Sequence, residues 1–397
     1  MKEKYIHISK GFPNSVPFIH LLTGYEPILI SANEGIDKPK NYFKLNSVKT
    51  YQDLGKEITK PKYVQLISNL AKKQGKIYIN NFENEGSWDE IYNIPNTKLI
   101  GLDSSQVKMF DNKLITYKLF NDVIPVPKFE ISSKEHMHSL FNKYNKGYGV
   151  FATLSEGGGG EGSKLCKTQE EIIKFATELP KNEKVLLVEG LDLVNCPSID
   201  VLVANENEII VYGLTDLIME GLSTKGAQYP SKINPQLQKK AYEIGMEIGK
   251  KVAQTGAKGY FNIDLNLDEN NKLYFGEINA RYGAISAERM LMMEYNKIPS
   301  QPTLLDLTKM ASEEGTLNGY TLGPEPNIPW YRLDLGKNKE NSIYLPSLSE
   351  QQIFQKGKGM ALIGQSNNNI GKLVLVGNNY VNYESQIRDS ILSKMRN

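Results

Sequence analysis

The first hundred residues alternate short apolar runs with polar stretches of helical periodicity. Between the apolar runs, Pro61–Gln74 places apolar residues at three- and four-residue steps, which predicts a helix with one buried face. The runs themselves predict strands at Tyr5–Ile8, Ile28–Ser31, Ile77–Asn80 and Lys98–Leu102. Because strands alternate with helices, residues 1–103 are predicted to form an α/β domain with a parallel sheet.

Beyond this domain the predicted elements are longer. A helix capped by Ser104 or Ser105 is expected to run to about Asn121, and the prolines that follow prevent its continuation. Apolar residues recur on one face of Gln236–Gln254, which predicts the clearest helix of the chain. Residues 318–397 are predicted to form a small C-terminal region of turns and short strands. Further elements are predicted at Gly149–Leu154, Thr168–Glu178, Lys184–Glu189, Ser198–Ala204, Glu208–Gly213, Gly359–Ile363 and Lys372–Val376.

Composition narrows the class of protein. A length of 397 residues with 40% hydrophobic residues is enough for two or three domains with buried cores. The net charge of +2 gives no overall field that favours nucleic acid or a membrane as partner. No apolar run is long enough to cross a bilayer. The two cysteines, Cys166 and Cys196, fit no zinc spacing and indicate a reducing compartment, so a cytoplasmic protein is expected.

Residues 260–281 carry the most informative chemical pattern. Apolar and polar residues alternate along the first half, a turn-prone run follows at Asp268–Asn271, and a second strand resumes at Leu273. A symmetric turn closed by Asp268 and Asn271 makes Asp264 and Glu277 diagonal neighbours, about 7–8 Å apart at the backbone. A register slip of one residue would place the two acids on opposite faces of the hairpin.

The side chains on that predicted face suit a hard cation. Two carboxylates with an amide oxygen from Asn279 are ligands that Mg²⁺ prefers, usually together with nucleotide phosphates. Arg281 adds a positive fork for a phosphate or a developing oxyanion. The alternative is an ordinary hairpin whose acids face water. The apolar neighbours of Glu277 on the same strand face weigh against that alternative.

A glycine-rich run at 155–162 separates two predicted strands. Four consecutive glycines let backbone N–H groups approach an anion closely, although a plain hairpin tip is the alternative. The spacing also matches G-x-G-x-x-G, but no helix follows directly, as a dinucleotide fold requires. The motifs of protein kinases and of Walker A are absent. The run therefore predicts a flap that closes over phosphates.

The order of these parts resembles the ATP-grasp superfamily of carboxylate–amine and carboxylate–thiol ligases. The resemblance runs from about Ser104 to Leu291. It rests on Asp111-Asn112-Lys113, the Ile-Pro-Val-Pro break, the glycine flap, the Val185–Leu191 segment, and Asp264 with Glu277-Ile-Asn-Ala-Arg281. It implies an α/β domain at 1–103, a two-lobed ATP-grasp core at 104–317 with a lid at about 125–205, and a C-terminal region at 318–397.

The resemblance also implies roles for individual residues. ATP is the expected nucleotide, with one or two Mg²⁺ ions and Mn²⁺ as a substitute. Arg281 would hold the acyl phosphate or the oxyanion. Asp264, Glu277 and Asn279 would bind the metal. The nucleotide would be held by Lys113 at a phosphate, by Gly157, Gly158, Gly159 and Gly160 over the phosphates, and by Glu189 and Leu191 at the adenine edge.

One position departs from the family pattern. The family usually places a second lysine near the end of the strand before the flap, where this chain has Thr153. We hypothesise that Lys164, across the flap hairpin, supplies the missing charge, while an ordinary solvated lysine is the alternative. The departure also leaves open a nucleotide-binding protein without turnover.

The function that the resemblance implies is amide-bond formation. A carboxylate would be activated by ATP as an acyl phosphate and joined to an amine of an amino acid or peptide, with release of ADP and phosphate. Transfer to a thiol carrier is the alternative enzyme reaction. The expected partners are these small molecules, with a homodimer left open. Ser286, Glu288 and Arg289, which follow Arg281, are candidates either for substrate contact or for structural roles.

Overall fold

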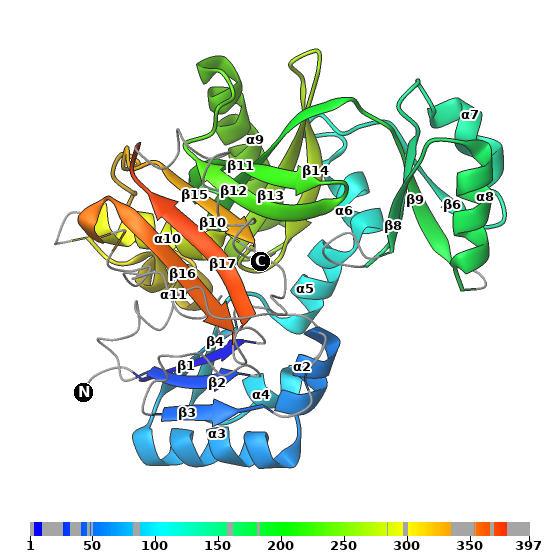
Figure 1. The fold of residues 1–397 in the computed structure, drawn as a ribbon. Coiled ribbons are helices and arrows are strands. Elements are labelled where there is room, and N and C mark those ends of the chain that lie inside the picture. The colour runs from blue at the N-terminus through cyan, green and yellow to red at the C-terminus, as the bar shows by residue number, and fades with distance from the viewer. Residues whose placement is uncertain are drawn as a thin grey trace.

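Three sheets organise the part of the chain that the computed structural model describes (Figure 1). The first has five parallel strands, the second four antiparallel strands and the third eight antiparallel strands. None of the described helices combines the length and apolarity needed to cross a bilayer. The described residues are 4–9, 27–31, 41–45, 48, 51–81, 88–156, 162–180, 183–283, 285–296, 301–334, 353, 355–365 and 369–378.

The five-stranded parallel sheet forms the N-terminal domain, as predicted. Its order β3-β2-β1-β4-β5 places the first strand at the centre. Isoleucines of the central strands pack against α3 (Pro61–Gln74), which has Pro61 in its first turn where no N–H partner is lost. The other elements are β1 (Lys4–Ser9), β2 (Pro27–Ser31), β3 (Asn41–Lys44), α2 (Tyr51–Ile58), β4 (Ile77–Asn81), α4 (Asp89–Tyr92) and β5 (Thr97–Ile100).

The long helix predicted from Ser104 to Asn121 is wrong, because the chain forms two helices there. Asp103 caps α5 (Ser104–Asp111) with a complete capping box, so the cap is one residue earlier than predicted. Asn112 then leaves helical geometry, and its side chain accepts from the first N–H groups of α6 (Lys113–Phe120). This cap fixes Lys113 as the first residue of α6.

A four-stranded antiparallel sheet forms the lid, which projects to the right in Figure 1. Apolar side chains of one of its faces pack against α7 (Phe141–Tyr144) and α8 (Gln169–Glu178). The sheet order is β6-β9-β7-β8. Its strands are β6 (Phe129–Ser133), β7 (Val150–Leu154), β8 (Ser163–Cys166) and β9 (Lys184–Glu189).

The eight-stranded sheet is the body of the molecule, and the C-terminal strands extend it instead of forming a separate sheet. One face packs against α9 (Pro235–Gln254), and the other against α10 (Ser286–Asn296) and α11 (Leu304–Glu314). Its strands are, in sheet order, β14 (Leu273–Asn279), β13 (Gly259–Asp268), β10 (Leu193–Asn205), β11 (Glu208–Glu220), β12 (Ser223–Tyr229), β15 (Trp330–Asp334), β17 (Asn369–Val376) and β16 (Gly359–Gln365).

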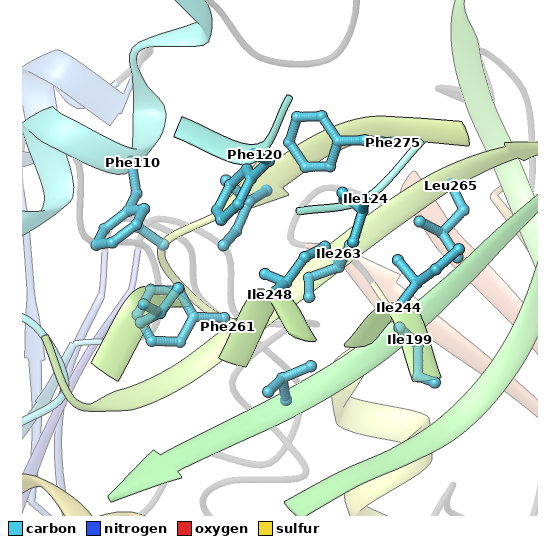
Figure 2. Close-up of a cluster of buried hydrophobic side chains, with 14 of the residues drawn as sticks. Phe110, Phe120, Ile124, Ile199, Ile244, Ile248, Phe261, Ile263, Leu265 and Phe275 are labelled. Atoms are coloured by element: carbon cyan, nitrogen blue, oxygen red, sulfur yellow. The ribbon is translucent and has the colours of Figure 1, made fainter. Parts of the chain in front are cut away.

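Aromatic pairs attach α5 and α6 to the hairpin of β13 and β14 (Figure 2). Phe110 meets Phe261 edge to face with ring centroids 5.3 Å apart, and Phe120 meets Phe275 at 5.1 Å. Isoleucines of α9 pack from the other side of this cluster. Because these rings are fully buried, the start of α6 is held firmly against the strands that carry the acidic residues.

Candidate active site

The hairpin of β13 and β14 has a different register from the predicted one. Asp268 donates its backbone N–H to the Lys272 carbonyl, so the turn is one residue longer, with Asn271 in left-handed geometry. A second shift of one residue occurs between Asp264 and Leu265, where Gly276 has no partner in the ladder. The two shifts together preserve the face, so Asp264 lies directly opposite Glu277 and not diagonal to it.

The opposed carboxylates create a strongly negative spot. Directly opposite side chains in an antiparallel pair have Cβ atoms about 4.5–5.5 Å apart. Burial is the main cause that raises the pKa of Asp264 to about 7, and the nearby Glu277 carboxylate is the second cause. Lys113 partly balances the charge, because its Nζ lies 3.5 Å from Glu277 Oε2. The structure therefore places Lys113 beside Glu277, and its contact with an ATP phosphate stays a prediction.

Asn279 is oriented by hydrogen bonds to its amide nitrogen. Its Nδ2 donates to Asn262 Oδ1 at 3.1 Å and to Asp264 Oδ2 at 3.3 Å. Asn262 pairs with Asn279 across the ladder, so the two amides share the face of the acids. The carbonyl oxygen of Asn279 is therefore the atom turned toward a ligand.

These residues fit a hard divalent cation. Asp264 Oδ1 is buried, and no described residue donates a hydrogen bond to it. Two carboxylates and one amide oxygen match the donor set that Mg²⁺ takes when nucleotide phosphates and water complete its shell. Among the described residues, no three or more His, Cys, Asp or Glu side chains are grouped so that they could hold a metal ion.

The base of the glycine flap is tied to the start of α6. The backbone N–H of Lys113 donates to the Ser155 carbonyl at 2.8 Å, so this lysine sits where the flap begins. Gly157, Gly158, Gly159 and Gly160 lie outside the described residues, and their role over the phosphates stays a prediction.

Thr153 and Lys164 lie on different faces of the lid sheet. Thr153 pairs with Ser163, and their hydroxyl oxygens are 2.7 Å apart, whereas Lys164 pairs with Ala152. The Ala152 face packs against the lid helices, away from the face that carries Thr153. This register weighs against the hypothesis that Lys164 replaces a lysine at position 153, and binding of ATP by either residue stays a prediction.

The predicted adenine hinge connects the lid to the body. Glu189 donates its backbone N–H to the Lys128 carbonyl at 2.9 Å, and its side chain accepts from the Lys128 N–H at 2.8 Å. Gly190 lies so close to the neighbouring chain that a Cβ there would be 2.4 Å from the Gly149 carbonyl oxygen. The backbone of the segment that leads to Leu191 is thus held tightly at the junction of the two lobes.

Arg281 lies two residues beyond the end of β14. It lines a small cavity with Leu99, Gly101 and Tyr282, at the carboxyl end of β5. The residue therefore lies where the body sheet meets the N-terminal domain. An acceptor that reaches Arg281 would enter between these domains.

Sequence reasoning missed a buried polar network beneath the acids. Asp200 on β10 and Arg289 on α10 are fully buried and form an ion pair, and Asn262 joins them to the hairpin. Ser286 and Glu288 are also fully buried, so they have structural partners instead of an open face toward substrate. The sequence signal for this network was Asp200, a charged residue inside the apolar run of β10.

Comparison with known proteins agrees with this geometry. Residues 117–291 match the family described as the carbamoyl-phosphate synthase L chain, ATP binding domain, a span that includes the lid and the hairpin. No curated protein sequence shows significant similarity to the chain. Residues 117–291 therefore form an ATP-binding domain of the ATP-grasp superfamily.

Similar solved structures cover nearly the whole chain at low identity. N5-carboxyaminoimidazole synthase from Aspergillus clavatus, in complex with ADP and 5-aminoimidazole ribonucleotide, is 11% identical with a TM-score of 0.66, covering 100% of this chain and 99% of that one. N5-carboxyaminoimidazole synthetase from Staphylococcus aureus with ADP is 16% identical with a TM-score of 0.65, covering 100% and 98%. Biotin carboxylase from Campylobacter jejuni is 15% identical with a TM-score of 0.69, covering 94% and 87%. At these identities the likeness shows the shared fold.

Proposed function

We propose that the chain is an ATP- and Mg²⁺-dependent ligase that activates a carboxylate and joins it to an amine. The observation that carries the proposal is the single sheet face with Asp264, Glu277 and Asn279, with Lys113 beside Glu277. Phosphoryl transfer needs positioning and neutralisation of charge more than covalent help from the protein. This face offers both.

In the first step a carboxylate oxygen attacks the γ-phosphorus of ATP and ADP leaves. Lys113 holds a phosphate oxygen by charge, and the lid encloses the nucleotide. Asp264, Glu277 and Asn279 would hold a divalent cation, which would neutralise charge on the phosphate oxygens. The product of the step is an acyl phosphate.

In the second step the amine nitrogen attacks the carbonyl carbon of the acyl phosphate. Arg281 donates to the oxygen on which negative charge develops, which is where a fixed cation lowers the barrier most. Phosphate then leaves, and the nitrogen loses a proton to water or to the departing phosphate. An amino acid or peptide is the proposed source of the amine.

A second candidate is attachment of a carboxyl group derived from bicarbonate. The biotin carboxylase domain of a 2-oxoglutarate carboxylase from Hydrogenobacter thermophilus, crystallised as a dimer in complex with MgADP, ADP and bicarbonate, has a TM-score of 0.69 at 16% identity, covering 94% of this chain and 86% of that one. The same two steps apply, with bicarbonate as the acid that is phosphorylated. Whether this chain dimerises stays a prediction.

The test is ADP release in the presence of separate substrate pools. Mixed amino acids and short peptides form one pool, and bicarbonate with amines but no other carboxylate forms the other. Use of ¹⁸O-labelled carboxylate is expected to transfer one label to the released phosphate. Release of AMP and pyrophosphate would contradict the acyl phosphate, and tight ATP binding without turnover on either pool would favour a nucleotide-binding protein.

A further inference from the structure

A buried chain of hydrogen bonds runs from the candidate metal ligand Asn279 into the interior of the sheet. Asn279 Nδ2 donates to Asn262 Oδ1 at 3.1 Å, and Asn262 Nδ2 donates onward to Asp200 Oδ1 at 2.9 Å. Asn262 Nδ2 also donates to Ser198 Oγ at 3.0 Å. Arg289 closes the chain as the ion-pair partner of Asp200.

We propose that Asn262 and Asp200 are positioning residues that present the carbonyl oxygen of Asn279 to the metal ion. The inference rests on the proposed role of Asn279 as a metal ligand. It adds that the orientation of this ligand is set from beneath the site, by residues that never touch metal or nucleotide. We call Asn279, Asn262, Asp200 and Arg289 the relay.

The direction of the relay follows from the chemistry of its last acceptor. Three donors converge on Asp200 Oδ1, from Asn262, Ser286 and Arg289, so this oxygen acts only as an acceptor. Asn262 must therefore turn its NH₂ toward Asp200 and its carbonyl toward Asn279. Asn279 in turn directs its NH₂ inward, which leaves its own carbonyl oxygen for a cation.

Burial keeps this order in place. Asn262 is 3% exposed, and Asp200 and Arg289 are 0% exposed, so water cannot replace any link without disrupting the interior. Arg289 is held at its other nitrogen by the Ser198 carbonyl at 2.7 Å and by Thr215 Oγ1. The anchor of the relay therefore belongs to α10, the helix that follows Arg281.

Close packing supplies a second constraint on Asn262. A Cβ added at Gly283 would lie 2.4 Å from Asn262 Oδ1 and 2.5 Å from its Cγ. Glycine at this position leaves the space that the amide needs for the observed orientation. The same position offers a way to displace Asn262 without removing any hydrogen-bonding group.

The test measures the affinity for Mn²⁺ by electron paramagnetic resonance. It is done with the metal alone and again with a non-hydrolysable ATP analogue. Asn262→Ala is expected to raise the Mn²⁺ dissociation constant about 10- to 100-fold, the range for lost partners of metal ligands. Gly283→Ala keeps every polar group and is expected to weaken Mn²⁺ at least about threefold in the same direction. If Asn262→Ala does not fold, Gly283→Ala is the variant that tests the relay.

Thr215→Val is the matched control. It removes one contact of Arg289 but leaves all links from Asp200 to Asn279, so it is expected to lower the melting temperature while changing Mn²⁺ affinity less than twofold. The relay is overturned if folded Asn262→Ala binds Mn²⁺ with wild-type affinity, or if Gly283→Ala does so when Asn262→Ala does not fold. It is also overturned if Thr215→Val weakens Mn²⁺ binding as much as these variants do. A wild-type protein that binds no Mn²⁺ on this face rejects the proposed metal site instead, so the two failures are distinguishable.

Discussion

Replacement of Asp264 by asparagine is predicted to stabilise the metal-free protein at neutral pH and to remove its stabilisation by metal and nucleotide. Asparagine keeps an oxygen that accepts from Asn279 Nδ2, as Asp264 Oδ2 does at 3.3 Å. It removes the negative charge that faces Glu277 across the ladder. The substitution therefore separates the cost of the charge from the packing of the hairpin.

The magnitude follows from the pKa of Asp264. Burial and the Glu277 carboxylate raise that pKa from 3.8 to about 7, and at 1.36 kcal/mol per pH unit this corresponds to about 4 kcal/mol. Because the folded state binds the proton more tightly, this contribution makes the wild type lose stability as pH rises from about 4 to about 7. Asp264→Asn lacks this loss, so its advantage grows over that window.

The assay is urea unfolding of both proteins in EDTA at pH 5 and pH 8. Between pH 5 and pH 8, the free energy of unfolding of Asp264→Asn relative to wild type is expected to rise by about 2–3 kcal/mol. This is less than the full effect because the interval covers only part of the titration of Asp264. Addition of Mg²⁺ with a non-hydrolysable ATP analogue is then expected to stabilise the wild type alone. A variant less stable than wild type at pH 8 would refute the reasoning.

Three further substitutions test other parts of the site and its frame. Arg281→Lys is expected to lower kcat in the ADP-release assay about 10²–10³-fold while leaving affinity for the ATP analogue within about twofold, since the fork acts on charge formed during the reaction; an unchanged kcat would exclude that role. Lys164→Ala is expected to leave the KM for ATP within about twofold, and a tenfold rise would restore the hypothesis that it replaces a lysine at 153. Burial alone would raise the pKa of Glu288, but ion pairs with Arg332 and Lys372 lower it to about 2, so its contribution to stability is present above about pH 4.5 and is lost toward pH 2. Glu288→Gln is expected to cost about 3 kcal/mol at pH 7 and to flatten the acid dependence of urea unfolding, and an unchanged slope would contradict the ion-pair account.

Local periodicity carried most of the fold prediction. Pro61–Gln74 has the predicted bounds, and four strands of the N-terminal sheet agree within one or two residues, because spacing of apolar residues is a local signal. The edge strand β3 was not predicted. The break at Asn112 was missed because it depends on the Asn112 side chain, which caps α6. A single asparagine is only a weak signal that a predicted helix is interrupted. The strands β16 and β17 were predicted, but β15, which joins them to β12, was not. The pairing of β15 with β12 is long-range, and no local pattern encodes it.

The sequence predicted that Asp264 and Glu277 share a face, but not the register that places them opposite each other. The face shared by Asp264 and Glu277 follows from alternation along two strands, so it was accessible from the sequence. The bulge at Gly276 was not, because it depends on close approach of two backbones, where a Cβ would lie 2.8 Å from the Asp264 carbonyl oxygen. The relay was missed because Asp200 and Asn262 are far apart in sequence, and the ladder between β10 and β13 brings them together.

The most direct test of the account is a crystal structure with Mn²⁺ and a non-hydrolysable ATP analogue, in which the metal is located by its anomalous scattering. The account predicts a peak between Asp264 and Glu277, within about 2.0–2.3 Å of a carboxylate oxygen from each, with the carbonyl oxygen of Asn279 and the phosphates beside it. A nucleotide bound elsewhere, or a peak that leaves this face of the hairpin empty, would contradict it.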